Sequence, residues 1–131
     1  MVKAAVVIAL SLVLALLGCR RETEYYYADI HGLIKDSASH SGINNIIVDI
    51  YDYNPDNNMS GRLHGSDTTE TRDGASGYYE ISHVCYGSNR GILLIGVAVD
   101  SMKNPAYKSI KTLQPVANSV ETMPDVYITR K

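Results

Sequence analysis

The sequence predicts an all-β domain in which two sheets pack face to face as a β-sandwich. Polar and apolar residues alternate along several short runs, turn-forming residues separate these runs, and no segment after residue 19 sustains the apolar period of an α-helix. About seven short strands within about 100 residues are typical of such a sandwich. The hydrophobic content of 45% is enough to build a core and excludes a wholly disordered chain.

The expected strands follow one another along the chain. Alternation is clearest in residues 27–35, where Ile30 and Ile34 face one side and His31 faces the other. A nearly continuous apolar run at residues 92–99 indicates a strongly buried central strand. The full set of expected strands is 27–35, 46–53, 67–72, 78–84, 92–99, 107–113 and 126–129, with turns or loops at 36–45, 54–65, 73–77, 86–91 and 101–106.

The aromatic residues are unusual, with ten Tyr and no Phe or Trp. Tyr suits half-buried strand faces because its ring packs while its hydroxyl stays in water. Residues 25–27 are all Tyr and are expected to begin the first strand; the alternative is that these rings rest at a membrane interface. Exposed Tyr rings can stack on sugars, although cross-strand packing is the favoured interpretation for the candidates, which are Tyr51, Tyr53, Tyr78, Tyr79 and Tyr86.

The N-terminal segment predicts export. A positive start at Lys3 precedes an apolar run over residues 4–17, which is shorter than the roughly 20 residues that a transmembrane helix needs. The run ends in Leu16-Leu17-Gly18-Cys19, which resembles the bacterial lipobox. That resemblance implies a signal peptide over residues 1–18, removed by cleavage, and a lipidated Cys19 whose thiol carries diacylglycerol and whose amine is acylated. An ordinary signal peptide and a retained anchor helix are the alternatives.

The lipobox resemblance also implies a location. The chain would divide into residues 1–18, a lipidated Cys and short linker over residues 19–26, and the sandwich over residues 27–131. Its partner is the membrane, held through the acyl chains on Cys19, because more than one chain is needed for stable anchoring. Arg20, rather than Asp, favours the outer membrane of a Gram-negative bacterium. With Cys19 acylated, Cys85 is alone and is expected to be buried; without acylation, a disulfide between the two is the main alternative.

Four stretches of the sandwich resemble the carboxypeptidase regulatory-like domains. They are residues 30–36 (IHGLIKD), 42–50 (GINNIIVDI), 71–81 (TRDGASGYYEI) and 125–128 (DVYI). The resemblance implies a seven-stranded prealbumin-like sandwich, which is transthyretin-like and Ig-like in architecture. It implies an accessory module on a secreted protein and transfers no catalytic residue.

One acidic stretch has the spacing that begins a calcium loop. Asp52, Asn54 and Asp56 follow the D-x-N-x-D pattern, but Asn57 stands where Gly is needed and Leu63 where a bidentate Glu is needed. A solvated loop is therefore expected. A calcium site of another type remains open because these oxygens are suitable hard ligands.

Other chemistry-bearing residues are scattered. None of the four histidines, which are His31, His40, His64 and His83, has the spacing of a helical zinc motif, so surface or edge positions are expected. Cys85 and His83, two residues apart, are expected to point to opposite faces or ends of one strand, so a Cys/His dyad would need a different His, and residues 74–77 do not form a nucleophile elbow. The formal net charge of −2 excludes the basic footprint of a nucleic-acid binder.

These observations predict a non-enzymatic, lipid-anchored cell-envelope lipoprotein whose β-sandwich is a binding or structural module, with no cofactor or metal. Two alternatives stay close to this prediction: a carbohydrate- or peptide-binding surface module, and an accessory subunit of an envelope enzyme. A third alternative is an enzyme that uses Cys85 or a calcium-bound loop. The sequence names neither a glycan nor a protein partner.

Overall fold

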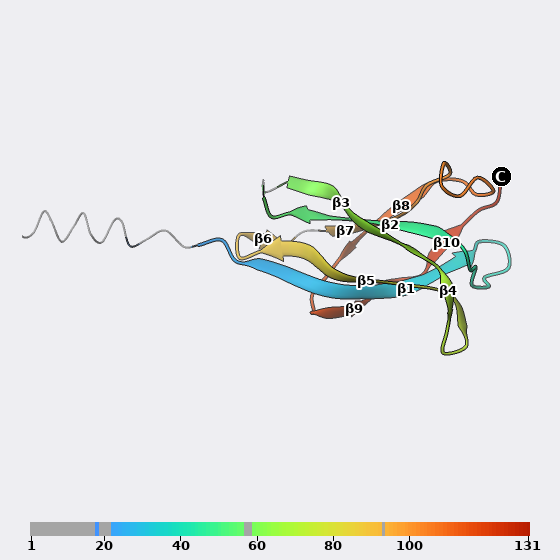
Figure 1. Ribbon diagram of the computed structural model, residues 1–131, viewed down its shortest axis with the longest axis horizontal. Helices are drawn as coiled ribbons and strands as arrows, with labels where there is room; N and C mark the ends of the chain where they lie inside the picture. The colour runs from blue at the N-terminus through green and yellow to red at the C-terminus, as the bar shows by residue number, and fades with distance from the viewer. Residues whose placement is uncertain (1–17, 19–21, 57–58, 93) are drawn as a thin grey trace, which may run out of the picture.

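The computed structural model describes residue 18 and residues 22–56, 59–92 and 94–131. The expected lipidation site, Cys19, lies outside these residues. Within them the chain forms ten strands and no helix (Figure 1). The strands are β1 (Tyr25–Asp36), β2 (Ile47–Asn54), β3 (Met59–Thr68), β4 (Glu70–Arg72), β5 (Ala75–Ser88), β6 (Gly91–Ile92), β7 (Leu94–Val99), β8 (Ile110–Pro115), β9 (Val120–Thr122) and β10 (Val126–Ile128).

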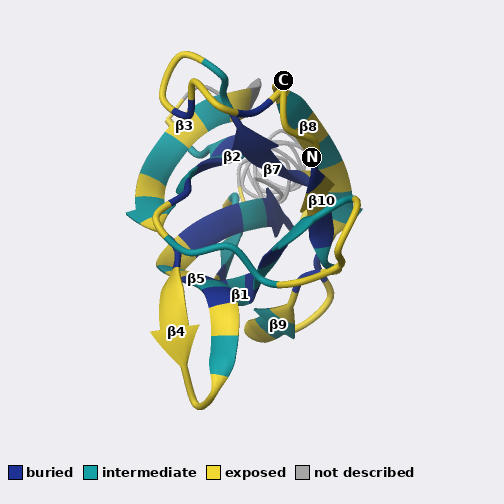
Figure 2. Cartoon of the chain, turned by 90° about the vertical axis from the view of Figure 1, so that its right-hand side faces the viewer, coloured by how far each residue is buried: buried dark blue, intermediate teal, exposed yellow. Residues whose placement is uncertain are grey.

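The strands build two sheets that face each other, which confirms the all-β, two-sheet prediction. The six-stranded sheet has the order β10-β1-β5-β4, with β9 also paired to β1 and β6 also paired to β5. The four-stranded sheet has the order β3-β2-β7-β8. Figure 2 shows the buried central strands, while the β4–β5 hairpin projects from the body with exposed residues.

The prediction of a loop at residues 54–65 is wrong, because β3 occupies most of this segment and pairs antiparallel with β2. Two irregularities in the register, after Ile50 and after Asp52, together with Gly61 at φ +82°, let this Gly- and Asn-rich segment follow the sheet. The sequence did not predict β3 because the segment is polar. Two of its polar side chains, Arg62 and His64, pair with the buried carboxylate of Asp52. Only residues 55–58 connect the two strands.

Two expected turns are shorter than predicted. The hairpin between β4 and β5 turns at Asp73 and Gly74 alone, and both have the positive φ (48° and 80°) that a two-residue hairpin turn needs. Strand β5 therefore starts at Ala75, not at Tyr78. It also continues to Ser88, so that only residues 89–90 form the next turn.

The apolar run at residues 92–99 is divided between the sheets. β6 pairs with β5 in the six-stranded sheet, whereas β7 lies between β2 and β8 in the other. Residues 95–99 of β7 are buried, which confirms a central strand there. The chain passes from one sheet to the other between β6 and β7. The sequence could not predict this, because the run is apolar throughout. With the unexpected β9 and the division of residues 67–72 between β3 and β4, this split raises the strand number from seven to ten.

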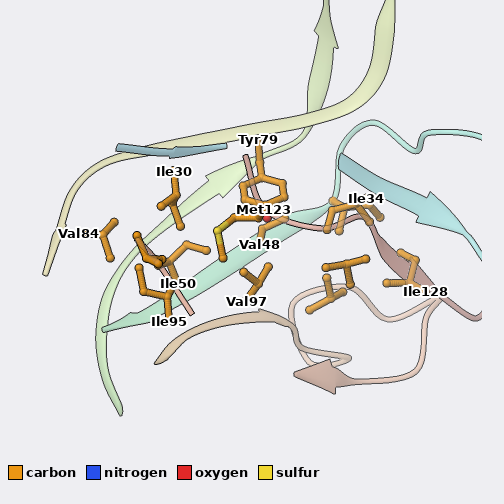
Figure 3. Close-up of a cluster of buried hydrophobic side chains, with 14 of the residues drawn as sticks. Ile30, Ile34, Val48, Ile50, Tyr79, Val84, Ile95, Val97, Met123 and Ile128 are labelled. Atoms are coloured by element: carbon orange, nitrogen blue, oxygen red, sulfur yellow. The ribbon is translucent and has the colours of Figure 1, made fainter. Parts of the chain in front are cut away.

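The core lies between the two sheets (Figure 3). Ile30 and Ile34 of β1 are fully buried, which confirms the alternation predicted for that strand, and Val48 and Ile50 of β2 are fully buried as well. Burial of each such side chain stabilises the fold by about 1.5–3 kcal/mol. Val97 of β7 adds the central strand of the second layer.

Gly32 and Tyr79 form a matched pair across β1 and β5. They are register partners, and the Tyr79 ring covers the face of Gly32. A Cβ at residue 32 would lie 2.6 Å from Oη and 2.9 Å from Cζ of Tyr79, so only glycine leaves room for the ring. Tyr79 is 0% exposed, and burial raises the pKa of its hydroxyl far above the ordinary value. Among the described residues, its hydroxyl has no hydrogen-bond partner.

Two other glycines permit a close backbone crossing at the end of β1. A Cβ on Gly77 would overlap the carbonyl oxygen of Ile34, and a Cβ on Gly42 would overlap that of Ser76. Asn44 Oδ1 accepts a hydrogen bond from Gly77 N at 2.7 Å. Segments from three of the stretches that carry the family resemblance thus meet at one place.

Candidate binding cleft

A cleft of about 400 Å³ lies on the outer face of the six-stranded sheet. Three separate parts of the chain line it: β1, the β4–β5 hairpin and the segment from β9 to β10. Figure 2 shows the hairpin and β9 projecting at the same end of the view. The lining residues are His31, Gly32, Leu33, Arg72, Asp73, Ala75, Tyr78, Thr122, Met123 and Asp125.

His31 and Tyr78 form the aromatic wall of the cleft. Their ring centroids are 5.9 Å apart in a stacked arrangement, and His31 Nε2 lies 2.9 Å from Thr122 Oγ1. The Arg72 guanidinium lies over the Tyr78 ring, 4.5 Å from its centroid. A cation–π contact at such an exposed site contributes about 0.5–1 kcal/mol. The Tyr78 ring is therefore packed by the chain's own side chains.

Paired charges line the cleft. Arg72 pairs with Glu70 at 3.0 Å and also with Glu80. Lys35 Nζ lies 2.6 Å from Asp125 Oδ2. The hydrogen bond with Asp125 raises the pKa of Lys35, and the hydrogen bond with Glu70 raises the pKa of Arg72, so both cations keep their charge.

The cleft lies beside an interruption in the strand pairing. β9 pairs with β1 at Asp29–His31 and β10 pairs with it at Ile34–Asp36. The register leaves Gly32 and Leu33 between the two pairings, where both line the cleft. Apolar surface at Leu33 thus adjoins donors, acceptors and ion pairs, an arrangement that suits recognition of an amphipathic ligand.

A hydroxyl beside an imidazole is also the beginning of a nucleophile–base pair. Thr122 and His31 have that spacing, but the next amide along the chain, Met123 N, donates to the His31 carbonyl oxygen at 2.7 Å. That N–H is engaged in strand pairing and does not face a reacting oxygen. This amide is therefore not placed to stabilise an oxyanion.

Asp52 does not lie in a solvated loop, so that expectation is wrong for this residue. It belongs to β2, is 0% exposed, and accepts hydrogen bonds from Arg62 Nε at 2.9 Å and Nη2 at 2.7 Å. His64 Nδ1 lies 3.1 Å away, and Cys85 N donates to the carboxylate at 3.3 Å. These contacts use the oxygens that a cation would need. Across the described ranges, no group of three His, Cys, Asp or Glu side chains is placed to hold a metal.

Cys85 is a free, buried thiol, which confirms the expectation of burial. Burial raises its pKa, and its Sγ lies 3.7 Å from the Gly87 carbonyl oxygen. His83 is exposed and stacks on Tyr27 with ring centroids 4.1 Å apart. The two residues face different surroundings, as the sequence predicted.

The other histidines divide by environment. His40 is exposed, and His31 is half-buried at the cleft. His64 lies on the edge strand β3, but its ring points inward and its Nε2 lies 3.1 Å from the Ser82 carbonyl oxygen. Both ring nitrogens are thus occupied by structural contacts with Asp52 and Ser82.

The tyrosines considered as sugar platforms are packed within the fold. Tyr79 is in the core and Tyr53 is 8% exposed, which excludes both as open platforms. Lys111 Nζ lies 4.0 Å from the ring centroid of Tyr51, and Tyr86 packs against Tyr26 at 6.0 Å. Tyr78 is covered by the groups described above.

Sequence reasoning missed most of the cleft. The Asp73-Gly74 turn was a usable signal, because it pairs β4 with β5 and so brings Arg72 close to Tyr78. Thr122 gave no comparable signal, because β9 is short and mostly exposed and pairs with a strand far away in sequence.

Within the described residues, none forms a helix long and apolar enough to cross a bilayer. A scan of protein-family models found no match to this chain. A search of curated proteins found no relative.

Proposed function

We propose that this chain is a non-enzymatic, lipid-anchored protein of the cell envelope whose β-sandwich is a binding module. The observation that best supports this proposal is the distance between the cleft and the start of the domain. β1 begins at Tyr25 and reaches the cleft at His31, a separation of about 20 Å along an extended strand. An anchor placed ahead of β1 leaves such a cleft accessible.

The anchor itself is the lipidated Cys19, by resemblance of residues 16–19 to the lipobox. Arg20 favours the outer membrane of a Gram-negative bacterium. The sandwich is proposed to be a carboxypeptidase regulatory-like, prealbumin-like domain. The two-sheet architecture and the close crossing at Gly42 and Gly77 support this, because those glycines belong to the stretches that carry the resemblance.

Three observations favour binding over catalysis. His64 Nδ1 contacts Asp52, and its other ring nitrogen, Nε2, contacts the Ser82 carbonyl oxygen and not a nucleophile. Cys85 is buried with a raised pKa, so little of it is the reactive thiolate. The amide beside Thr122 is used in strand pairing.

The ligand that fits the cleft best is a peptide segment, either free or exposed on an envelope protein. The cation over Tyr78 occupies a ring face that a sugar would need. Ion pairs at Arg72 and at Lys35 can instead be exchanged for the mixed charges of a peptide, while Leu33 supplies apolar contact.

The anchor is tested by mass spectrometry of the mature N-terminus and by metabolic labelling with an alkyne fatty acid. We expect an acylated N-terminus at Cys19 and no label in Cys19→Ser. A mature protein that begins at Met1 contradicts the anchor.

Binding is tested by selecting a displayed random-peptide library against the immobilised mature protein. His31→Asn should weaken the selected peptides several-fold, because it removes the ring at the cleft wall. His40→Asn is the matched control, since His40 is exposed and outside the cleft. Failure to enrich any peptide, or equal effects of the two substitutions, contradicts the peptide-binding role of this cleft.

A further inference from the structure

We propose that one end of the domain, formed by the start of β1 and the β5–β6 turn, lies against the bilayer that holds the anchor. This inference rests on the proposed lipid anchor and adds the lipid surface as a second partner of the sandwich. Contact at this end would fix the orientation of the domain, not only its distance from the membrane.

Asn89 ties the segment ahead of β1 to the β5–β6 turn. Its Nδ2 donates to the Glu22 carbonyl oxygen at 3.0 Å, and its Oδ1 accepts from Glu24 N at 3.3 Å. Its backbone N donates to the Glu24 carbonyl oxygen at 2.9 Å. Three hydrogen bonds from one residue therefore hold residues 22–24 on the body of the domain.

This clamp shortens the tether. A free linker over residues 20–24 could extend about 18 Å, but with Glu22 held on the domain only the three peptide steps from Cys19 remain, about 11 Å. The headgroup region is about 5–8 Å thick on each side of a bilayer, so this reach carries Glu22 only a few ångströms beyond it. A lipidated Cys19 therefore brings the β5–β6 turn to the headgroup region.

The side chains at this end suit that position. Tyr25 packs near Tyr53 with ring centroids 6.2 Å apart, and Tyr26 packs near Tyr86 at 6.0 Å. Tyr rings are enriched at membrane–water interfaces because one end is apolar and the other polar. Arg90 is exposed in the turn and can extend its charge to lipid phosphates.

The opposite end of β1 provides the comparison. Ala38 is exposed in the turn that follows β1, and β1 itself spans about 36 Å from Tyr25 to Asp36. In the proposed orientation Ala38 lies away from the bilayer and Arg90 lies at it. A sandwich free to tumble on its tether would expose both residues to lipid equally.

The experiment measures fluorescence quenching by nitroxides attached to lipid headgroups. The full lipoprotein is reconstituted in vesicles of phosphatidylethanolamine and phosphatidylglycerol after labelling Arg90→Cys or Ala38→Cys with bimane. Unsubstituted protein gives the background, because Cys85 is buried. We expect quenching at residue 90 to exceed that at residue 38 several-fold.

Adding Asn89→Ala should remove most of this difference while the protein stays on the vesicles. Asn118→Ala, which breaks an exposed side-chain bond to Glu121, should leave it unchanged. Equal quenching of both labels in protein that floats with the vesicles overturns the orientation and leaves the anchor standing. Protein that does not float at all overturns the anchor and this inference together.

Discussion

Replacing Tyr79 with Phe should stabilise the domain. Tyr79 is 0% exposed, and its hydroxyl has no hydrogen-bond partner among the described residues. Burial of a hydroxyl without a partner costs about 1–3 kcal/mol in proteins. Phe keeps the ring that covers Gly32 and removes only the oxygen. We therefore expect the free energy of unfolding to rise by about 1–2 kcal/mol.

The assay is urea unfolding of the mature protein in detergent, followed by circular dichroism, with thermal unfolding as a second measurement. For a domain of this size, each kcal/mol corresponds to about 4 °C in Tm. Tyr86→Phe is the control on the same strand, and because Tyr86 is only half-buried its effect should stay within about 0.5 kcal/mol.

A second substitution tests whether the hydroxyl also crowds Gly32. Gly32→Ala should destabilise the wild type by about 1–3 kcal/mol because the new Cβ overlaps the Tyr79 ring. The penalty should be smaller in Tyr79→Phe, since the contact at 2.6 Å disappears and the contact with Cζ at 2.9 Å remains. A loss of more than about 1 kcal/mol in Tyr79→Phe alone would refute the reasoning, because the hydroxyl would then be making a net favourable hydrogen bond.

Three further predictions follow from buried or hydrogen-bonded polar groups. Asp52→Asn should lower the free energy of unfolding by about 1.5–3 kcal/mol, because Arg62, which is itself partly exposed, loses charge-assisted hydrogen bonds to a buried carboxylate; a loss below about 0.5 kcal/mol in urea unfolding would show that the pair is dispensable. Cys85 should react with a maleimide only when the protein unfolds, since burial raises its pKa; native reaction at the rate of free cysteine contradicts this. Backbone N–H groups, that of Ser39 first, hold the pKa of Asp36 below its ordinary value of 3.8, so its carboxylate stabilises the fold above that pH and the contribution is lost as pH falls through the folded pKa. Asp36→Asn should therefore flatten the pH dependence of stability in that acid range, and an unchanged curve in pH-dependent unfolding counts against the assignment.

Alternation predicted the strands whose side chains follow a simple inside–outside division. β1 and β2 bury Ile30 and Ile50 on one face, and β10 alternates over its short length. Strand β3 escaped prediction because Arg62 and His64 are polar and only partly buried, and they pair with the buried Asp52 on the neighbouring strand. A polar side chain that is buried against a partner cannot be told from a solvated one by sequence pattern alone.

The cleft was beyond sequence reasoning for a different reason. Its walls come from parts of the chain that only the sheet topology brings together, and β9 carries little hydrophobic signal of its own. The hairpin turn at Asp73 and Gly74 was correctly identified, although it is shorter than expected. Local turn chemistry could therefore place Arg72 near Tyr78 but could not supply Thr122 on the opposite wall.

The parallel pairing of β1 with β9 and β10 bears on the export that we propose, in which the chain would leave the cytoplasm amino end first. β1 would emerge early, yet about 90 residues must follow Ile34 before Val126 arrives to close that flank. Until then a long strand presents bare amides and carbonyls, the kind of template on which chains cross-associate. In the proposed export of this domain, removal of β10 should therefore shift the exported product from monomer to aggregate.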